Sequence, residues 1–354
     1  MAEAVPSIAV IPGDGIGTEV VASARAVLDA LDRRHGLGLT YEEYDWSCRR
    51  YLDTGAMMPD DGLETLAHHD AILLGAVGWP GVPDHVSLWG LLIPIRRAFR
   101  QYVNLRPIRV FDGVHSPLRY ADQGVDFVVV RENVEGEYSE IGGRLNRGFP
   151  DEIAVQESVF TRAGVTRVVD YALDLAEERR GRLTSATKSN GIVHTMPFWD
   201  EVVSERTAKH PDVAWEQVHI DALAAKFVLD PASFDVVVAS NLFGDILSDL
   251  AAAVAGSIGI APSANLDPTR THPSMFEPVH GFAPDIAGKG VANPVGAVWS
   301  CVLMLEHLGA SDAAGELMRG VETALADPAT RTRDLGGTAS TEQVTTRLVE
   351  LVGG

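Results

Sequence analysis

The stretch Phe234-Asp-Val-Val-Val-Ala-Ser-Asn-Leu-Phe-Gly-Asp-Ile-Leu-Ser-Asp-Leu250 decides the fold class, because a short apolar run passes directly into a helical pattern. Residues 234–239 read as a buried strand, and the residues that follow carry apolar side chains at helical spacing. A strand that leads into a helix is the repeating unit of α/β proteins. The stretch therefore predicts one strand–helix unit of an α/β fold.

The same alternation continues on both sides of this unit. Strands are predicted over residues 7–11, 71–76, 126–130, 153–160 and 183–187, and helices over residues 18–35, 165–179, 197–210, 294–308, 313–326 and 342–352. Strands that alternate with helices indicate an α/β protein with much parallel sheet. A break rich in Gly and Pro at residues 261–273 suggests that the chain changes domain there.

Composition and charge exclude several kinds of partner. The chain has 354 residues, enough for two domains, and a formal net charge of −20. Such an acidic chain is not expected to bind nucleic acid or an anionic membrane, and its longest apolar tract, residues 250–262, is too short and too interrupted by glycine to cross a bilayer. The two cysteines, Cys48 and Cys301, lie far apart and in no motif, so a reducing cytoplasm is the expected location.

Two carboxylates in the opening stretch are candidate metal ligands. Asp245 and Asp249 are four residues apart, which places them on one face of a helix with Cβ atoms roughly 5–6 Å apart. Like charges at this spacing repel unless a cation lies between them, and a divalent ion with oxygen ligands would serve. The alternative is a solvated helix face with Asp245 as N-cap, and spacing alone does not decide between the two.

A glycine-rich turn follows the first predicted strand. The sequence Gly13-Asp-Gly-Ile-Gly17 lies between strand and helix patterns, but it does not match the dinucleotide fingerprint, since residue 18 is Thr. A tight turn and a phosphate cradle remain equally good interpretations.

Three arginines could form the positive pocket that an acidic protein needs in order to bind a small anion. Arg96 and Arg106 flank a predicted passage from helix to strand, and Arg131 ends a predicted strand. The planar guanidinium group matches a carboxylate, and ligands of α/β sheets bind at strand ends. Surface salt bridging is the alternative for any one of them.

Three further polar residues stand at the ends of predicted elements. Lys188 ends a strand and could act as a base or as an anchor for an anion, while Tyr138 lies in a loop and could be a proton donor or a packed aromatic. Asp221 lies where a strand meets a helix, so it is either a further metal ligand or a helix cap.

A long polar loop over residues 276–294 is a further candidate site, because irregular loops of this kind often carry function. It contains Glu277, His280, Asp285 and Asn293. Asp285 could accept hydrogen bonds from a ribose diol, as acidic residues do in NAD sites. The alternative is a structural loop with helix caps.

Together these segments resemble the β-decarboxylating dehydrogenases, the family of isocitrate and 3-isopropylmalate dehydrogenase. The resemblance extends from the glycine turn to the last helices, and its most specific parts are residues 241–259 and 277–294. It implies an isocitrate/isopropylmalate dehydrogenase-like fold of two α/β domains that is not a Rossmann fold. Residues 1–103 and 260–354 would form a large cofactor-binding domain, and residues 104–259 a smaller domain for substrate, metal and dimerisation.

The resemblance also implies roles for individual residues in a homodimer with shared sites. Tyr138 would protonate carbon, and Lys188 of the partner would assist removal of the hydroxyl proton. Mn²⁺ or Mg²⁺ would be bound by Asp245 and Asp249 with Asp221 of the partner, and K⁺ is a further candidate cofactor. NAD, favoured over NADP by Asp285 and Ile286, would be bound by Glu277, His280, Gly281, Ala283, Pro284, Asp285, Ile286 and Asn293. The substrate would contact Arg96, Arg106, Arg131, Trp89 and Leu92.

The segment before Arg96 bears on the substrate. Isopropylmalate enzymes usually carry glutamate where this chain has Trp89, and the pattern Asp84-His-Val-Ser-Leu-Trp-Gly90 resembles the tartrate and D-malate dehydrogenases of the family. We therefore expect NAD- and metal-dependent oxidative decarboxylation of a small 2-hydroxy diacid, either D-malate to pyruvate and CO₂ or a reaction of tartrate. The alternatives are a 3-isopropylmalate or isocitrate dehydrogenase and, in a different class, a non-catalytic nucleotide-binding paralogue.

Overall fold

The computed structural model describes residues 5–118 and 124–354, which divide into two compact units. One unit comprises Met1–Gln101, Arg109–Asp122 and Ala252–Gly354, and the other comprises Tyr102–Ile108 and Gln123–Ala251. In the described part of the chain, no helix is both long and apolar enough to cross a membrane.

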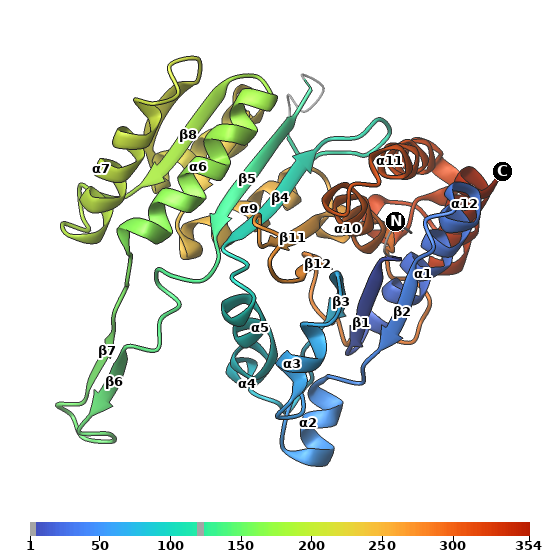
Figure 1. The fold of residues 1–354 in the computed structure, drawn as a ribbon, viewed down its shortest axis with the longest axis horizontal. Helices are drawn as coiled ribbons and strands as arrows, with labels where there is room; N and C mark the ends of the chain where they lie inside the picture. Colours follow the sequence, from blue (N-terminus) through green and yellow to red (C-terminus); the bar gives the residue numbers. More distant parts are fainter. Residues whose placement is uncertain (1–4, 119–123) are drawn as a thin grey trace. The chain divides into compact units, whose positions relative to one another are not determined.

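The first unit is built on strands in the order β2-β1-β3-β12-β11 (Figure 1). All neighbours pair in parallel except β11 and β12, which are antiparallel. The strands are β1 (Ser7–Gly13), β2 (Thr40–Glu43), β3 (Ala71–Ala76), β11 (Pro262–Leu266) and β12 (Ser274–Pro278). The helices are α1 (Gly17–His35), α2 (Cys48–Thr54), α3 (Gly62–Leu66), α4 (Asp84–Ser87), η1 (Leu88–Leu92), α5 (Ile93–Ala98), α10 (Val295–His307), α11 (Ser311–Ala326) and α12 (Thr341–Gly353).

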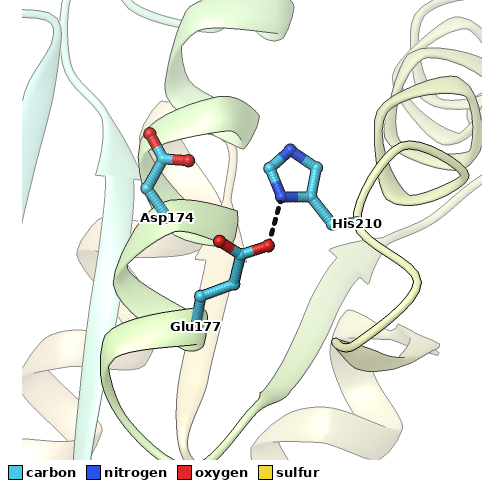
Figure 2. A group of neighbouring side chains, drawn as sticks. All are labelled: Asp174, Glu177 and His210. Carbon is cyan, nitrogen blue, oxygen red and sulfur yellow. Dashed lines mark hydrogen bonds and ion pairs between the residues drawn. The ribbon is translucent and has the colours of Figure 1, made fainter.

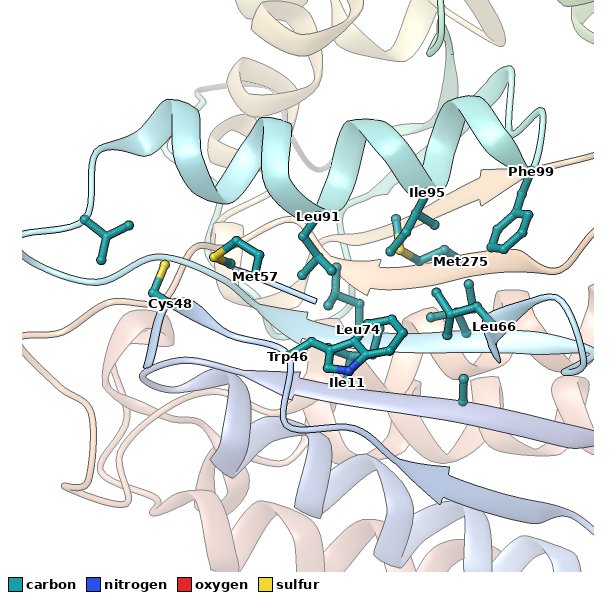
Figure 3. Close-up of a cluster of buried hydrophobic side chains, with 13 residues drawn as sticks. Ile11, Trp46, Cys48, Met57, Leu66, Leu74, Leu91, Ile95, Phe99 and Met275 are labelled. Atoms are coloured by element: carbon teal, nitrogen blue, oxygen red, sulfur yellow. The ribbon is translucent and has the colours of Figure 1, made fainter. Parts of the chain in front are cut away.

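Strand alternation gives this sheet two apolar faces. Ala9 and Ile11 of β1 contribute to a buried cluster with Leu91 and Ile95 from η1 and α5 (Figure 3). Successive side chains of a strand point to opposite faces, so Ile8 and Val10 of β1 face the other way. Helix α10 packs against β11 and β12, and α1 packs against β3 and α12.

The second unit has strands in the order β4-β5-β10-β8-β9, and β5, β10, β8 and β9 pair in parallel. These strands are β4 (Val103–Arg109), β5 (Asp126–Glu132), β8 (Arg182–Thr187), β9 (Ala214–His219) and β10 (Val236–Ala239). The helices are α6 (Arg162–Glu178), α7 (Thr195–Thr207), α8 (Ile220–Leu229) and α9 (Asn241–Val254), whose last residues belong to the first unit.

Aromatic side chains fill the core of this unit. Phe127 of β5, Phe227 of α8 and Phe234 form a buried group with ring centroids 4.9–5.7 Å apart. Trp199 of α7 is fully buried, and its ring nitrogen donates a hydrogen bond to Ser185 Oγ of β8 at 3.1 Å. Burial of such rings is the main apolar contribution to a core of this kind.

A two-stranded antiparallel arm also belongs to the second unit (Figure 1). It is formed by β6 (Gly142–Leu145) and β7 (Ile153–Gln156), and every residue of both strands is exposed. Its apolar side chains include Leu145 and Phe149, which are 64% and 67% exposed. An isolated hairpin is at best marginally stable in water.

The α/β class with mostly parallel sheet is confirmed, and every predicted helix is present within a few residues of its predicted bounds. Two details differ from the expectation. The strand predicted over residues 153–160 ends at Gln156 and lies in the exposed arm. The break predicted over residues 261–273 begins with the fully buried strand β11, which contains Pro262 and Asn265; the proline lies at the start of the strand, where its missing amide proton costs least.

Candidate active site

Asp245 and Asp249 both lie inside α9, so the interpretation of Asp245 as an N-cap is wrong. Their side chains are 35% and 58% exposed. Arg106 of β4 reaches both carboxylates: its Nη2 lies 3.5 Å from an Asp245 oxygen and its Nη1 lies 3.3 Å from an Asp249 oxygen. Nη1 also donates to Ser248 Oγ at 2.5 Å. One guanidinium group of the chain therefore contacts both carboxylates in this structure.

A second arginine contacts the same carboxylates from β5. Arg131 is almost fully buried, and its Nη1 donates to Asp245 Oδ1. Its Nε and Nη2 both donate to Asn241 Oδ1, at 3.1 and 2.7 Å. Two of the three predicted arginines, Arg106 and Arg131, thus contact the same carboxylates, and their two positive charges face two negative ones.

Tyr138 joins this group through its phenol. Its hydroxyl donates to Asp245 Oδ2 at 3.0 Å, so it is not simply a packed aromatic. Burial raises the pKa of Tyr138, the Asp245 carboxylate raises it further, and Arg131 opposes the shift. The phenol consequently holds its proton at neutral pH and can act as a proton donor.

The carboxylate pair suits a hard divalent cation. Burial raises the pKa of Asp249 above its usual value, and the charge of Asp245 adds to this effect while Arg106 and Arg131 reduce it. Two carboxylates on one helix face provide the kind of oxygen donors that Mg²⁺ or Mn²⁺ prefers. Asp245 and Asp249 would hold such an ion.

Lys188 and Asp221, the other two predicted polar residues, pair with each other. Lys188 directly follows β8, and its Nζ donates to Asp221 Oδ1 at 2.7 Å. Asp221 is the second residue of α8 and His219 holds the N-cap position, so the alternative role of Asp221 as N-cap is wrong. The hydrogen bond from Lys188 lowers the pKa of Asp221.

Arg96 belongs to the first unit and is also paired. Its Nη2 donates to Glu277 Oε1 at 3.0 Å, and both side chains are about nine-tenths buried. The same Glu277 oxygen accepts from Asn265 Nδ2 at 2.8 Å. Glu277, predicted to bind cofactor, therefore contacts one of the predicted substrate-binding arginines, which fixes the position of that guanidinium group.

Trp89 and Leu92 lie in the π-helical turn η1 before α5. Leu92 packs on the apolar cluster of Figure 3, and the guanidinium carbon of Arg97 lies 5.0 Å from the centre of the Trp89 ring. This distance allows a cation–π interaction between Arg97 and the indole ring. Pro94 is the second residue of α5, which follows the π-helical turn directly.

The predicted cofactor segment packs on the glycine turn. Ile16 N donates to Phe282 O at 2.9 Å, and a Cβ atom added to Gly15 would lie 2.0 Å from the same oxygen. Gly15 is therefore required for close backbone packing, and its φ of +57° also favours glycine. The turn interpretation is sufficient for these glycines.

Within that segment the backbone makes a second tight turn, since Ile286 N donates to Ala283 O at 3.1 Å around Pro284 and Asp285. Asp285 is exposed. A cavity of about 580 Å³ adjoins this region and is lined by residues that include Gly13, Tyr44, Trp79, Ala287 and Gly288.

Two polar residues near this turn are held in place. His280 is buried, its Nδ1 lies 3.1 Å from Gly281 O, and its Nε2 has no hydrogen-bond partner among the residues that the structure describes. Burial lowers the pKa of His280. Asn293 Nδ2 donates to Asp334 Oδ2 at 3.0 Å. A buried, neutral imidazole with an open nitrogen is suited to a hydrogen bond with a nucleotide base or ribose, so these residues fit a dinucleotide.

One group of ligand-type side chains was not predicted. Among the described residues, Asp174 and Glu177 of α6 and His210, after α7, form the only group of three or more whose ligand atoms all lie within 4.8 Å of one another (Figure 2). His210 Nδ1 and a Glu177 oxygen are hydrogen-bonded at 2.7 Å. Two of the three side chains are exposed, so a solvated ion pair accounts for the group.

The sequence analysis did not identify the residues that form hydrogen bonds with the predicted site residues. Asn241 binds Arg131, Ser248 binds Arg106 and Asn265 binds Glu277. Asn241 and Ser248 lie on α9 at four and three residues from Asp245, a spacing that places them beside the same face and could have indicated them.

The sequence was compared with known proteins. It matches the model of the isocitrate/isopropylmalate dehydrogenase family over residues 7–352. The chain belongs to this family. It is 55% identical to a tartrate dehydrogenase/decarboxylase of Pseudomonas putida over 95% of both chains. It is 53% identical to a D-malate dehydrogenase [decarboxylating] of Escherichia coli over 98% of both chains. The resemblance seen in the sequence is confirmed.

A solved structure of the family has the same fold. The isocitrate dehydrogenase of Methylococcus capsulatus superposes with a TM-score of 0.89 at 32% identity, over 99% of this chain and 100% of that one. The fold class is confirmed. The names of the relatives support an enzyme that acts as a decarboxylating dehydrogenase.

Proposed function

We propose that this protein catalyses the NAD- and divalent-metal-dependent oxidative decarboxylation of a small 2-hydroxy diacid, either D-malate to pyruvate and CO₂ or the corresponding reaction of tartrate. One observation carries the proposal: the carboxylates of Asp245 and Asp249 on α9 are contacted by two guanidinium groups and a phenol. These groups belong to Arg106, Arg131 and Tyr138. The names of the two relatives support this choice of substrate.

The arginines bind and orient the diacid. Arg106 and Arg131 present planar donor groups that match carboxylates, and Arg96, fixed by Glu277, presents a third. When a divalent ion is bound by Asp245 and Asp249, it supplies Lewis-acid polarisation of the substrate oxygens. NAD, when bound by residues of the 277–293 segment, supplies the hydride acceptor.

The proton transfers are assigned to two side chains. For D-malate, the C2 hydride leaves with its electron pair and Lys188 Nζ assists departure of the hydroxyl proton, giving a β-keto acid. The bond from C3 to the distal carboxylate then breaks, CO₂ leaves, and the electron pair of that bond stays on the substrate as the enolate of pyruvate. Tyr138 delivers its phenolic proton to C3. The hydrogen bond between Lys188 and Asp221 orients the Nζ group for the first transfer.

We also propose a homodimer in which Lys188 and Asp221 serve the partner's site. The exposed apolar arm of β6 and β7 supports a second copy as its partner surface. So does α8, which carries Asp221 and exposes Val228 and Leu229. Sedimentation velocity should show a dimer, and substituting Leu145 and Phe149 by serine should shift it towards monomer with loss of turnover.

We also propose a division of function between the two domains expected from the sequence. Residues 1–103 with 260–354 would bind cofactor, and residues 104–259 would bind substrate and metal and form the dimer. A cytoplasmic location is proposed, supported by Cys48 and Cys301, which are buried, free and too basic to react readily, because burial raises their pKa to about 12.

A panel of substrates tests the proposal. Purified protein with NAD⁺ and Mn²⁺ is expected to reduce NAD⁺ with D-malate or a tartrate isomer at a kcat/KM above that for 3-isopropylmalate or isocitrate. The position of Trp89 under Arg97, which fills space beside α5 with a large ring, favours the compact diacids. Absence of NADH formation with all four substrates would instead support the non-catalytic paralogue.

A further inference from the structure

Glu137 makes contacts that the proposed reaction does not use. Its Oε1 accepts a hydrogen bond from Ser240 Oγ at 2.7 Å, and its Oε2 accepts from Leu242 N at 3.0 Å. Leu242 lies in the first turn of α9, where backbone amides have no acceptor within the helix. Glu137 therefore caps α9 from a separate loop, with its negative charge at the positive end of the helix.

The next residue of that loop contacts the next turn of the same helix. Tyr138 donates to Asp245 Oδ2, three residues beyond Leu242. A third link comes from Asn241, whose Nδ2 donates to Glu135 O at 3.0 Å. Consecutive loop residues thus follow the helix face that bears the carboxylates.

The far side of this loop is fixed to a different helix. Both oxygens of Glu135 accept from Thr161, one from its amide and one from its hydroxyl at 2.8 Å each, and Thr161 is the N-cap of α6. Between the two glutamates, Gly136 has a φ of +91° and pairs with Val159 through two backbone hydrogen bonds. The loop is therefore held between α6 and α9, and Glu137 supplies the attachment nearest to Tyr138.

We propose that Glu137 is a positioning residue, which caps α9 and thereby keeps the Tyr138 hydroxyl beside the carboxylates of Asp245 and Asp249. The inference rests on the proposed function, in which Tyr138 delivers the proton to carbon. The proposed reaction assigns Glu137 no contact with substrate or ion. Its effect reaches the reaction through the adjoining peptide and through the first turn of α9.

Amide hydrogen exchange tests the attachment without any substrate. In Glu137→Ala, exchange of the amides of residues 241–245 should accelerate by about tenfold, the order expected for loss of a charge-assisted hydrogen bond. Glu137→Gln, whose amide oxygen can still accept, should show a smaller change. Ser340→Ala is the matched control, since it removes a helix cap from α12 in the other unit and should leave exchange at residues 241–245 unchanged.

Kinetics test the effect on Tyr138. With D-malate, Mn²⁺ and NAD⁺, Glu137→Ala should lower kcat by about tenfold and leave KM within about twofold, while Glu137→Gln recovers part of the loss. In a Tyr138→Phe background, Glu137→Ala should lower kcat no further. An equal loss of kcat in both backgrounds would overturn the proposal, because Glu137 would then act independently of Tyr138.

The two proposals fail in different ways. Wild-type protein that turns over none of the diacids would refute the proposed function, while the exchange measurement would still decide whether Glu137 holds the loop on α9. Unchanged exchange in Glu137→Ala would refute the positioning role even in a fully active enzyme.

Discussion

Replacement of Asp249 by asparagine should separate metal binding from folding. The variant loses an ion pair with Arg106 at 3.3 Å, which at a side chain 58% exposed is worth only about 0.2–1 kcal/mol. It also loses the repulsion from Asp245 four residues earlier, which contributes about 0.2–0.5 kcal/mol in the opposite direction. The free energy of unfolding without metal should therefore change by less than about 1 kcal/mol.

The effect on the ion should be far larger. Loss of an outer partner of a metal ligand already costs about 10–100-fold in affinity, so loss of a charged ligand should raise the Kd for Mn²⁺ by at least about 100-fold. At a Mn²⁺ concentration of about 100 times the wild-type Kd, the ion stabilises wild-type protein by about 2.7 kcal/mol. The same concentration should stabilise Asp249→Asn by only about 0.4 kcal/mol.

Unfolding with and without Mn²⁺, followed beside turnover of D-malate, measures both effects. Asp174→Asn, which alters the acidic group of Figure 2, is the control and should keep the wild-type response. Burial raises the folded-state pKa of Asp249 above its usual 3.8. As the pH is lowered, the Mn²⁺ affinity of wild-type protein should therefore begin to fall at a higher pH than it would if Asp249 had an ordinary pKa. Wild-type stabilisation and turnover in Asp249→Asn would refute the assignment of this carboxylate to the ion.

Three other outcomes are expected. Lys188→Met should keep the Mn²⁺ stabilisation but lose about 10²–10⁴-fold in kcat, as for removal of an acid–base group, and unimpaired oxidation would remove Lys188 from the mechanism. Burial raises the pKa of Glu132 from 4.5 to about 7. The neutral carboxyl group therefore adds about 3 kcal/mol to the free energy of unfolding below pH 4.5, and this contribution is lost as the pH rises through 7. The free energy of unfolding of Glu132→Gln, measured with denaturant, should not show this loss between pH 5 and 8. A pH dependence equal to that of wild type would contradict the role assigned to Glu132. Trp89→Ala removes the ring under Arg97. The ratio of kcat/KM for 3-isopropylmalate to kcat/KM for D-malate should then rise. An unchanged ratio would show that the ring does not shape the substrate site.

The regular elements could be predicted from the sequence because local patterns determine them. The run of residues 71–76 is apolar throughout and forms β3 with the predicted bounds. The helix predicted from residue 18 forms as α1 and ends at Gly36, in the left-handed conformation that glycine favours. Strands β6 and β9 lack an apolar pattern, since nearly all their residues are exposed, and they were not predicted.

Of the candidate site, the sequence indicated the residues but not their pairing. Spacing placed Asp245 and Asp249 on one face, and the structure agrees. That Arg106 and Arg131 compensate these acids depends on β4, β5 and α9 coming together from distant parts of the chain. The contact between Arg96 and Glu277 joins residues 181 positions apart, a separation over which no local pattern extends.

The pairing of Arg106 and Arg131 with Asp245 and Asp249 leaves these four side chains electrically neutral as a set. A doubly charged cation alone would leave an excess of two positive charges there, and a dianion alone an excess of two negative charges. Both together restore neutrality, so each should strengthen the binding of the other by the same factor, as thermodynamic reciprocity requires.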